Sequence, residues 1–108
     1  MSYVLEAVSA PDCRIELSVT QMGTAVHELT RLGALTGDAD DPELLSYDDL
    51  NDLSGKVLHP HRVRGSLSRA SAAKERPTQD LCAFLERAAE NGGARVAMRD
   101  GRSDQENV

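Results

Sequence analysis

The sequence has few aromatic residues and no long apolar run. Of its 108 residues only 3% are aromatic, and tryptophan is absent. Stacking of unpaired bases requires aromatic rings, so this scarcity argues against a dedicated single-strand nucleic-acid binder. No stretch approaches the roughly 20 apolar residues of a transmembrane helix, and the N-terminus lacks a basic, signal-like region. We therefore expect a cytoplasmic protein that does not bind membranes.

Cysteine is scarce as well. Cys13 and Cys82 are too few for a disulfide framework, and both lie in apolar patterns, so we expect buried, reduced thiols. Apolar surroundings raise the pKa of a thiol, which argues against nucleophilic Cys-His catalysis. The sequence also lacks a G-x-S-x-G elbow, a phosphate-binding glycine-rich loop and a C-x-x-C pair. These absences predict a protein that is not an enzyme and carries no cofactor.

The overall composition fits one globular domain. Hydrophobic residues make up 40% and charged residues 28% of the chain, which separates it from disordered proteins. A chain of this length buries roughly two thirds of the surface that it exposes when unfolded, which allows one core. We expect a single domain over residues 1–100 and a frayed polar tail over residues 101–108.

Alternating hydrophobicity predicts three strands. Residues 13–20 alternate most clearly, and residues 3–8 form a second strand joined to the first by a short connection rich in turn residues. Residues 94–100 alternate in the same way and would return to this antiparallel hairpin. A sheet this small has two edges, and an exposed edge can pair with another chain. A homodimer through a sheet edge is therefore a further expectation.

Helical periodicity predicts the remaining elements. Apolar residues recur at intervals of three and four over residues 21–35 and from Thr78 to the glycines at 92 and 93. Residues 66–75 read as an alanine-rich helix with Ser66 as its cap. The order of elements predicts an α+β domain: a small antiparallel sheet, made by the N-terminal hairpin and the C-terminal strand, packed in two layers against three to four helices.

Residues 38–52, here called the acidic segment, contain seven acidic residues and no basic one. Ser46 and Asp49 have the spacing of a capping box, which indicates a short helix or turns. The segment does not match a calcium-binding loop, because Pro42 and Leu44 occupy positions where ligands belong. We expect a solvated acidic face that docks on a basic protein partner through six residues: Asp40, Asp41, Glu43, Asp48, Asp49 and Asp52.

Residues 56–76, the basic segment, contain six Lys and Arg residues and one Glu. They offer an alternative site for phosphate or a nucleic-acid backbone, formed by Arg62, Arg64, Ser66, Ser68 and Arg69. The formal net charge of −6 opposes the approach of a polyanion unless the basic patch is well separated from the acidic one. A third interpretation is a surface loop that is ion-paired with the acidic segment.

The basic segment begins with His59, Pro60 and His61. If this stretch is extended, both imidazoles point to the same side and could face one metal ion. A zinc site needs at least one more ligand, and none lies at a recognisable spacing. We expect no metal; His59 and His61 are the residues to test first.

The functional hypothesis follows by elimination. A compact acidic protein with segregated charge and no reactive constellation is typical of a small protein-binding module, such as an immunity or antitoxin protein, an inhibitor of a nucleic-acid enzyme, or a regulatory subunit. The alternative is a nucleic-acid or phosphate-binding accessory protein that uses residues 56–76.

Overall fold

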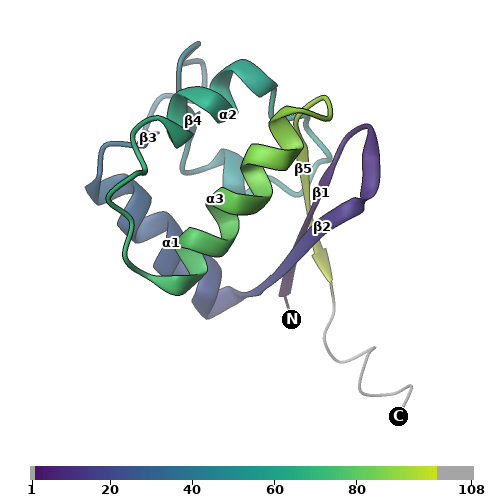
Figure 1. Cartoon of the computed structure of the whole chain (residues 1–108), viewed down its shortest axis with the longest axis horizontal. Helices are drawn as coiled ribbons and strands as arrows, with labels where there is room; N and C mark the ends of the chain where they lie inside the picture. Colours follow the sequence, from purple (N-terminus) through teal and green to yellow (C-terminus); the bar gives the residue numbers. More distant parts are fainter. Residues whose placement is uncertain (1, 100–108) are drawn as a thin grey trace.

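The computed structural model of the chain describes residues 2–99, so the predicted polar tail lies outside the described residues. Strands and helices alternate along this part of the chain (Figure 1). In order they are β1 (Ser2–Ala7), β2 (Ala10–Ser18), α1 (Val19–Arg31), β3 (Leu35–Thr36), β4 (Leu45–Ser46), the 3-10 turn η1 (Asp49–Asn51), α2 (Pro60–Leu67), α3 (Arg76–Ala89) and β5 (Ala94–Arg99).

The main sheet has three strands, with β1 in the centre and antiparallel to both β2 and β5, whereas the short strands β3 and β4 form a separate parallel pair. Leu5 lies opposite Ile15 on one side and Val96 on the other. The α+β class and the antiparallel sheet of an N-terminal hairpin plus a C-terminal strand are confirmed. Alternation dictates this outcome, because it gives each strand one apolar face to bury.

The core lies between that apolar face and the helices. Leu5 of β1 and Phe84 of α3 are fully buried, and Met22 of α1 is 1% exposed. α1 and α3 pack on each other and on β2, whereas α2 packs on α3 and β4. Residues 2–99 contain three α-helices, and none of them is long and apolar enough to cross a bilayer.

The first helix begins before the predicted position. Ser18 caps α1, since its hydroxyl accepts the Gln21 amide at 3.0 Å while the Gln21 side chain accepts the Ser18 amide at 2.8 Å. This capping box ends β2 at Ser18, so Val19 and Thr20 are helical and not part of a strand. The periodicity of apolar residues predicted the helix but not the position of its N-cap, Ser18.

The predicted helix over residues 66–75 is wrong. The helix begins at Pro60 and ends at Leu67, and residues 68–75 form turns and irregular backbone. Pro60 occupies the first turn, where proline is favoured because the missing N–H has no intrahelical partner there. Ser66 therefore lies near the end of α2 and does not cap a helix start.

Both ends of α3 are completed by side chains from elsewhere in the chain. The buried carboxylate of Glu28, in α1, accepts the backbone amides of Lys74 at 2.9 Å and Glu75 at 3.2 Å. At the other end, the guanidinium of Arg64, in α2, donates to the Ala89 carbonyl at 3.0 Å. A carboxylate at the start and a guanidinium at the end both suit the helix dipole.

The pKa of Glu28 is lowered from its ordinary value. The largest cause is the nearby Thr78 hydroxyl, which favours the ionised carboxylate although it does not meet the geometric criteria of a hydrogen bond. The backbone amide of Lys74 is the next cause and acts in the same direction. These groups outweigh burial, which favours the neutral form. Glu28 is therefore ionised at neutral pH and suited to hold the start of α3.

Candidate partner-binding site

The acidic segment has little regular structure of its own, and its aspartates shape it. The Asp38 carboxylate accepts the Asp40 amide at 2.9 Å. The Asp41 carboxylate accepts the amides of Glu43 at 2.7 Å and Leu44 at 3.1 Å. Such short-range bonds are typical of Asx turns, in which the side chain replaces a backbone partner. The carboxylates of Asp38 and Asp41 therefore help to fold the first half of the segment.

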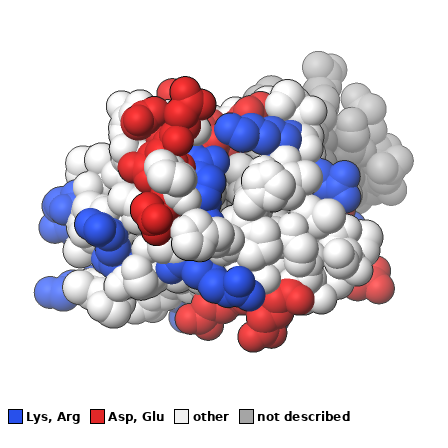
Figure 2. All heavy atoms as spheres, turned by 90° about the horizontal axis from the view of Figure 1, so that it is seen from above, with Lys and Arg blue, Asp and Glu red and all other residues white. Residues whose placement is uncertain are grey.

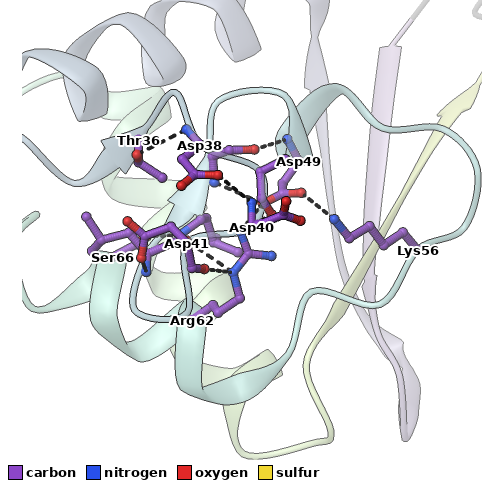
Figure 3. A network of polar contacts seen from close by, with 12 residues as sticks. Thr36, Asp38, Asp40, Asp41, Asp49, Lys56, Arg62 and Ser66 are labelled. Carbon is purple, nitrogen blue, oxygen red and sulfur yellow. Dashed lines mark hydrogen bonds and ion pairs between the residues drawn. The ribbon is translucent and has the colours of Figure 1, made fainter.

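Ser46 and Asp49 form the reciprocal pair that their spacing predicts. The Ser46 hydroxyl accepts the Asp49 amide at 3.1 Å, and the Asp49 carboxylate accepts the Ser46 amide at 2.9 Å. Asp49 is only 2% exposed. Its carboxylate also lies 3.0 Å from the Lys56 ammonium and 2.7 Å from the Arg62 guanidinium (Figure 3). Asp49 is thus the centre of a buried polar network.

Arg62 joins this network to the rest of the acidic segment. Its side chain is 12% exposed. Besides Asp49, it reaches three backbone carbonyls: Asp41 at 2.8 Å, Leu44 at 3.1 Å and Ala39 at 3.3 Å. Figure 3 shows the guanidinium inserted among the residues of the loop. Charges of the basic and acidic segments therefore pair within one molecule, through a guanidinium whose fixed fork suits several acceptors at once.

The pKa of Asp49 is lowered from its ordinary value, despite burial. Burial is the largest single influence, and it raises the pKa. The Ser46 amide, the Lys56 ammonium and the Arg62 guanidinium each lower the pKa, and their combined effect is larger than that of burial. The carboxylate is therefore charged at neutral pH. A buried charge of this kind has to keep its partners, because leaving it unpaired is costly.

α2 approaches the acidic segment at Gly65. A Cβ atom built on Gly65 would lie 1.7 Å from the carbonyl oxygen of Glu43, so only glycine fits there. One residue later, the buried Ser66 hydroxyl accepts the Leu45 amide at 2.9 Å. Gly65 and Ser66 thus allow β4 to pack closely on α2. The sequence-based hypothesis instead expected the Ser66 hydroxyl to bind a phosphate.

The six predicted contact residues divide into three groups. Asp40, Glu43 and Asp48 are exposed, Asp41 and Asp52 are half-buried, and Asp49 is buried. The Ser54 hydroxyl, followed by the Ser54 amide, holds the pKa of Asp52 below its usual range. The exposed group is therefore accessible to solvent, whereas the Asp49 carboxylate makes its contacts in the interior.

Figure 2 looks onto the end of the molecule that carries β3, β4 and α2 in Figure 1. Many of the acidic side chains gather there in a patch with basic side chains at its border, and others lie apart from it along the opposite margin of this view. Tyr47, which the sequence-based prediction missed, is 40% exposed and precedes Asp48 in this segment. An aromatic residue within an acidic stretch was the available signal, since such residues are enriched at protein interfaces.

The predicted phosphate-binding residues do not form one exposed set. Arg62 is committed to the acidic segment and Arg64 to the end of α3, as described above. The Ser68 hydroxyl donates to the Gly65 carbonyl of its own helix at 2.6 Å. Arg69 is exposed. The contacts described for Arg62, Arg64, Ser66 and Ser68 are internal, and they do not converge on a common point.

The two candidate metal-binding histidines are also separated by the local fold. His59 is the extended residue before α2, and His61 lies inside the helix, so the same-side geometry of an extended stretch is not adopted. The His61 imidazole lies 3.2 Å from the Glu43 carboxylate at the surface. Within residues 2–99, no group of three or more His, Cys, Asp or Glu side chains could hold a metal ion.

The thiol of Cys82 is unsuited to nucleophilic catalysis. Burial, followed by the nearby Glu86 and Glu28 carboxylates, raises its pKa to about 11. The thiol therefore stays protonated at neutral pH, and the thiolate is the reactive form. This agrees with the expectation that apolar surroundings raise the pKa at this position.

Comparison of the chain with protein-family models, with curated proteins and with solved structures returned no match in any of the three. The geometry of the acidic segment is therefore the main guide to what this chain does.

Proposed function

We propose that the protein is a binding module that docks its acidic segment on the basic surface of a partner protein, as an inhibitor, an immunity or antitoxin protein, or a regulatory subunit would. The observation that supports this most strongly is the polar network beneath the segment, formed by Asp49, Lys56 and Arg62. Arg62 and Asp49 fix the loop from the inside, so the outward-facing carboxylates need little further ordering on binding. A surface held in its bound conformation loses less entropy when a complex forms.

The composition of the exposed surface supports the same proposal. Asp40, Glu43 and Asp48 provide negative charge that would steer a basic partner and fix its orientation. Tyr47, at 40% exposure, provides the rigid aromatic group that binding hot spots favour. Leu53, at 48% exposure, adds apolar area shortly after the segment.

The nucleic-acid alternative has weaker support. The guanidinium groups of Arg62 and Arg64 are occupied by internal acceptors. The formal net charge of −6 adds long-range repulsion of a polyanion. A gel-shift measurement with nucleic acid distinguishes this alternative from protein binding.

The test is a charge reversal that spares the polar network. Asp40→Lys with Asp48→Lys changes two exposed side chains, whereas reversal at Asp49 would disrupt the interior. The matched control is Glu86→Lys with Glu90→Lys, which makes the same change of net charge at two exposed positions, one in α3 and one at its C-cap. Tagged proteins are used to capture partners from a lysate of the source organism, and captured proteins are identified by mass spectrometry.

We expect the wild type and the α3 control to capture the same basic protein, and the Asp40→Lys, Asp48→Lys variant to lose it. Recovery should fall as salt is added, because screening weakens the steering charges. Tyr47→Ala should reduce recovery at every salt concentration. Equal capture by all variants would overturn the proposal. So would a gel shift of nucleic acid that Arg64→Glu with Arg69→Glu abolishes.

A further inference from the structure

The outer edge of β2 is unpaired within the part of the chain that the structure describes, because β2 is the end strand of the sheet. The opposite edge differs: there β5 is partly covered by the bridge between Leu58 and Ala94. Cys13 and Ile15, two apolar residues of β2, are half-buried. An edge strand of nine residues offers a row of backbone donors and acceptors to another strand.

We propose that β2 pairs with β2 of a second copy of this chain, antiparallel about a two-fold axis at Ile15, so that two sheets join into one of six strands. A two-fold interface requires a self-complementary surface. In this register Arg14 of each copy lies opposite Glu16 of the other. Opposite charges on directly facing positions stabilise an antiparallel pair, and like charges destabilise it.

Neighbouring registers are less favourable. With the sheet faces aligned, an axis at Arg14 puts two arginines opposite each other, and an axis at Glu16 puts two glutamates opposite each other. An axis at Cys13 brings Pro11 into the paired region, where it has no N–H to donate. The axis at Ile15 pairs residues 12–18 of the two copies, which include no proline.

Helix α3 adds a second complementary feature at the same place. A groove of about 310 Å³ runs along the edge, lined by residues 14–17 of β2 and by Asp80, Ala83 and Arg87 of α3. The two-fold axis brings α3 of the second copy alongside in the antiparallel direction. With the small Ala83 near the axis, Asp80 of each copy faces Arg87 of the other, in addition to its exposed contact with Arg76 of its own helix at 3.0 Å. The strand edge and the helix therefore favour the same partner.

The interface does not include the acidic segment, so dimerisation and partner capture are tested separately. Sedimentation of the full chain over a range of concentrations should show a species of twice the chain mass of 11.7 kDa. Arg14→Glu and Glu16→Arg should each abolish this species at concentrations where the wild type is dimeric. Asp40→Lys with Asp48→Lys should leave it unchanged.

The decisive variant is the charge swap Arg14→Glu with Glu16→Arg. It restores opposite charges across the axis. Within each chain, the glutamate introduced at position 14 still faces Glu6, its cross-strand neighbour in β1, just as in the single variant Arg14→Glu. Recovery of the dimer therefore assigns the effect to the interface and not to the fold. A monomeric wild type, or a swap that stays monomeric while circular dichroism shows it folded, would overturn the proposal.

A cross-linking measurement covers the case in which the charge variants fail to fold. Ile15→Cys in a Cys13→Ser background places one thiol per chain on the axis and should give a covalent dimer on oxidation. Wild-type Cys13 lies opposite Leu17 in this register and should not cross-link. Cross-linking through Cys13 in its place would contradict the axis at Ile15.

Discussion

The sheet with α1 and α3 and the acidic segment with α2 are stabilised in different ways. In the first region, apolar residues such as Leu5, Leu81 and Phe84 are fully buried, so the stabilisation is distributed over many packing contacts. In the second, Leu45 and Leu50 are also fully buried, but the largely buried Arg62 guanidinium and the buried Asp49 carboxylate connect the loop to the helix. The comparison shows that a polar loop whose own carboxylates form its turns can be joined to a helix by one arginine side chain that reaches several of its acceptors.

Removing that side chain should produce the largest effect. Arg62→Ala deletes bonds to Asp49 and to three carbonyls and leaves a buried carboxylate with only Lys56 as a cationic partner. We expect the free energy of unfolding to fall by about 3–5 kcal/mol. Urea denaturation measures this loss. Arg69→Ala, an exposed arginine near the end of the same helix, should change stability by less than about 0.5 kcal/mol.

Conservative substitutions should separate the two regions next. Leu81→Met in the apolar core keeps the volume and should cost less than about 1.5 kcal/mol. Arg62→Lys keeps the charge but loses the planar fork, and we expect a loss of about 2 kcal/mol or more. Equal losses in the two variants, measured by the same denaturation experiment, would remove the distinction between the regions.

Gly65→Ala tests the close approach of α2 to the acidic segment. Alanine favours a helix over glycine by about 1 kcal/mol, so propensity alone predicts a more stable protein. The clash of the new Cβ with the Glu43 carbonyl predicts the opposite sign, a loss of about 1–3 kcal/mol. Gly23→Ala, in α1, is the control, because no atom lies within 4 Å of its added Cβ. It should be neutral or stabilising in thermal unfolding.

Acid should weaken the network through Asp49. Its pKa is lower in the folded protein than in the unfolded chain, so its contribution is complete above the unfolded-state pKa of about 3.9 and is lost as the pH falls through the folded value. Stability of the wild type should therefore fall as the pH drops below about 4, and that of Asp49→Asn should fall less steeply. Parallel slopes in urea denaturation would contradict the assignment.

The smallest effect is expected for the exposed pair of His61 and Glu43. Their side chains are 72% and 70% exposed, so solvent screens the contact. His61→Ala should change the free energy of unfolding by less than about 0.5 kcal/mol. A change close to that of Arg62→Ala would mean that the surface pair, and not the buried one, holds the acidic segment.

The same contrast explains what the sequence could predict. The strands and the apolar faces of α1 and α3 follow from periodicity, and the Ser46–Asp49 pair follows from local spacing. The start of α2 at Pro60 was missed because proline was taken as a sign of extended chain. The role of Arg62 could not be predicted, because its acceptors lie 13 to 23 residues away and carry no local signal. An arginine on a surface loop and one in a buried network look alike in a sequence.

The two ends of α3 bear on how the chain folds. The two backbone amides just before its first residue are held by Glu28 and its last carbonyl by Arg64, residues that belong to α1 and α2. A helix of 14 residues is marginal in isolation and gains most of its stability from docking. A peptide of α3 alone should thus fray at both termini, and helix formation should be coupled to assembly of the neighbouring elements. We expect the described domain to unfold in one cooperative transition, with α3 as its common link.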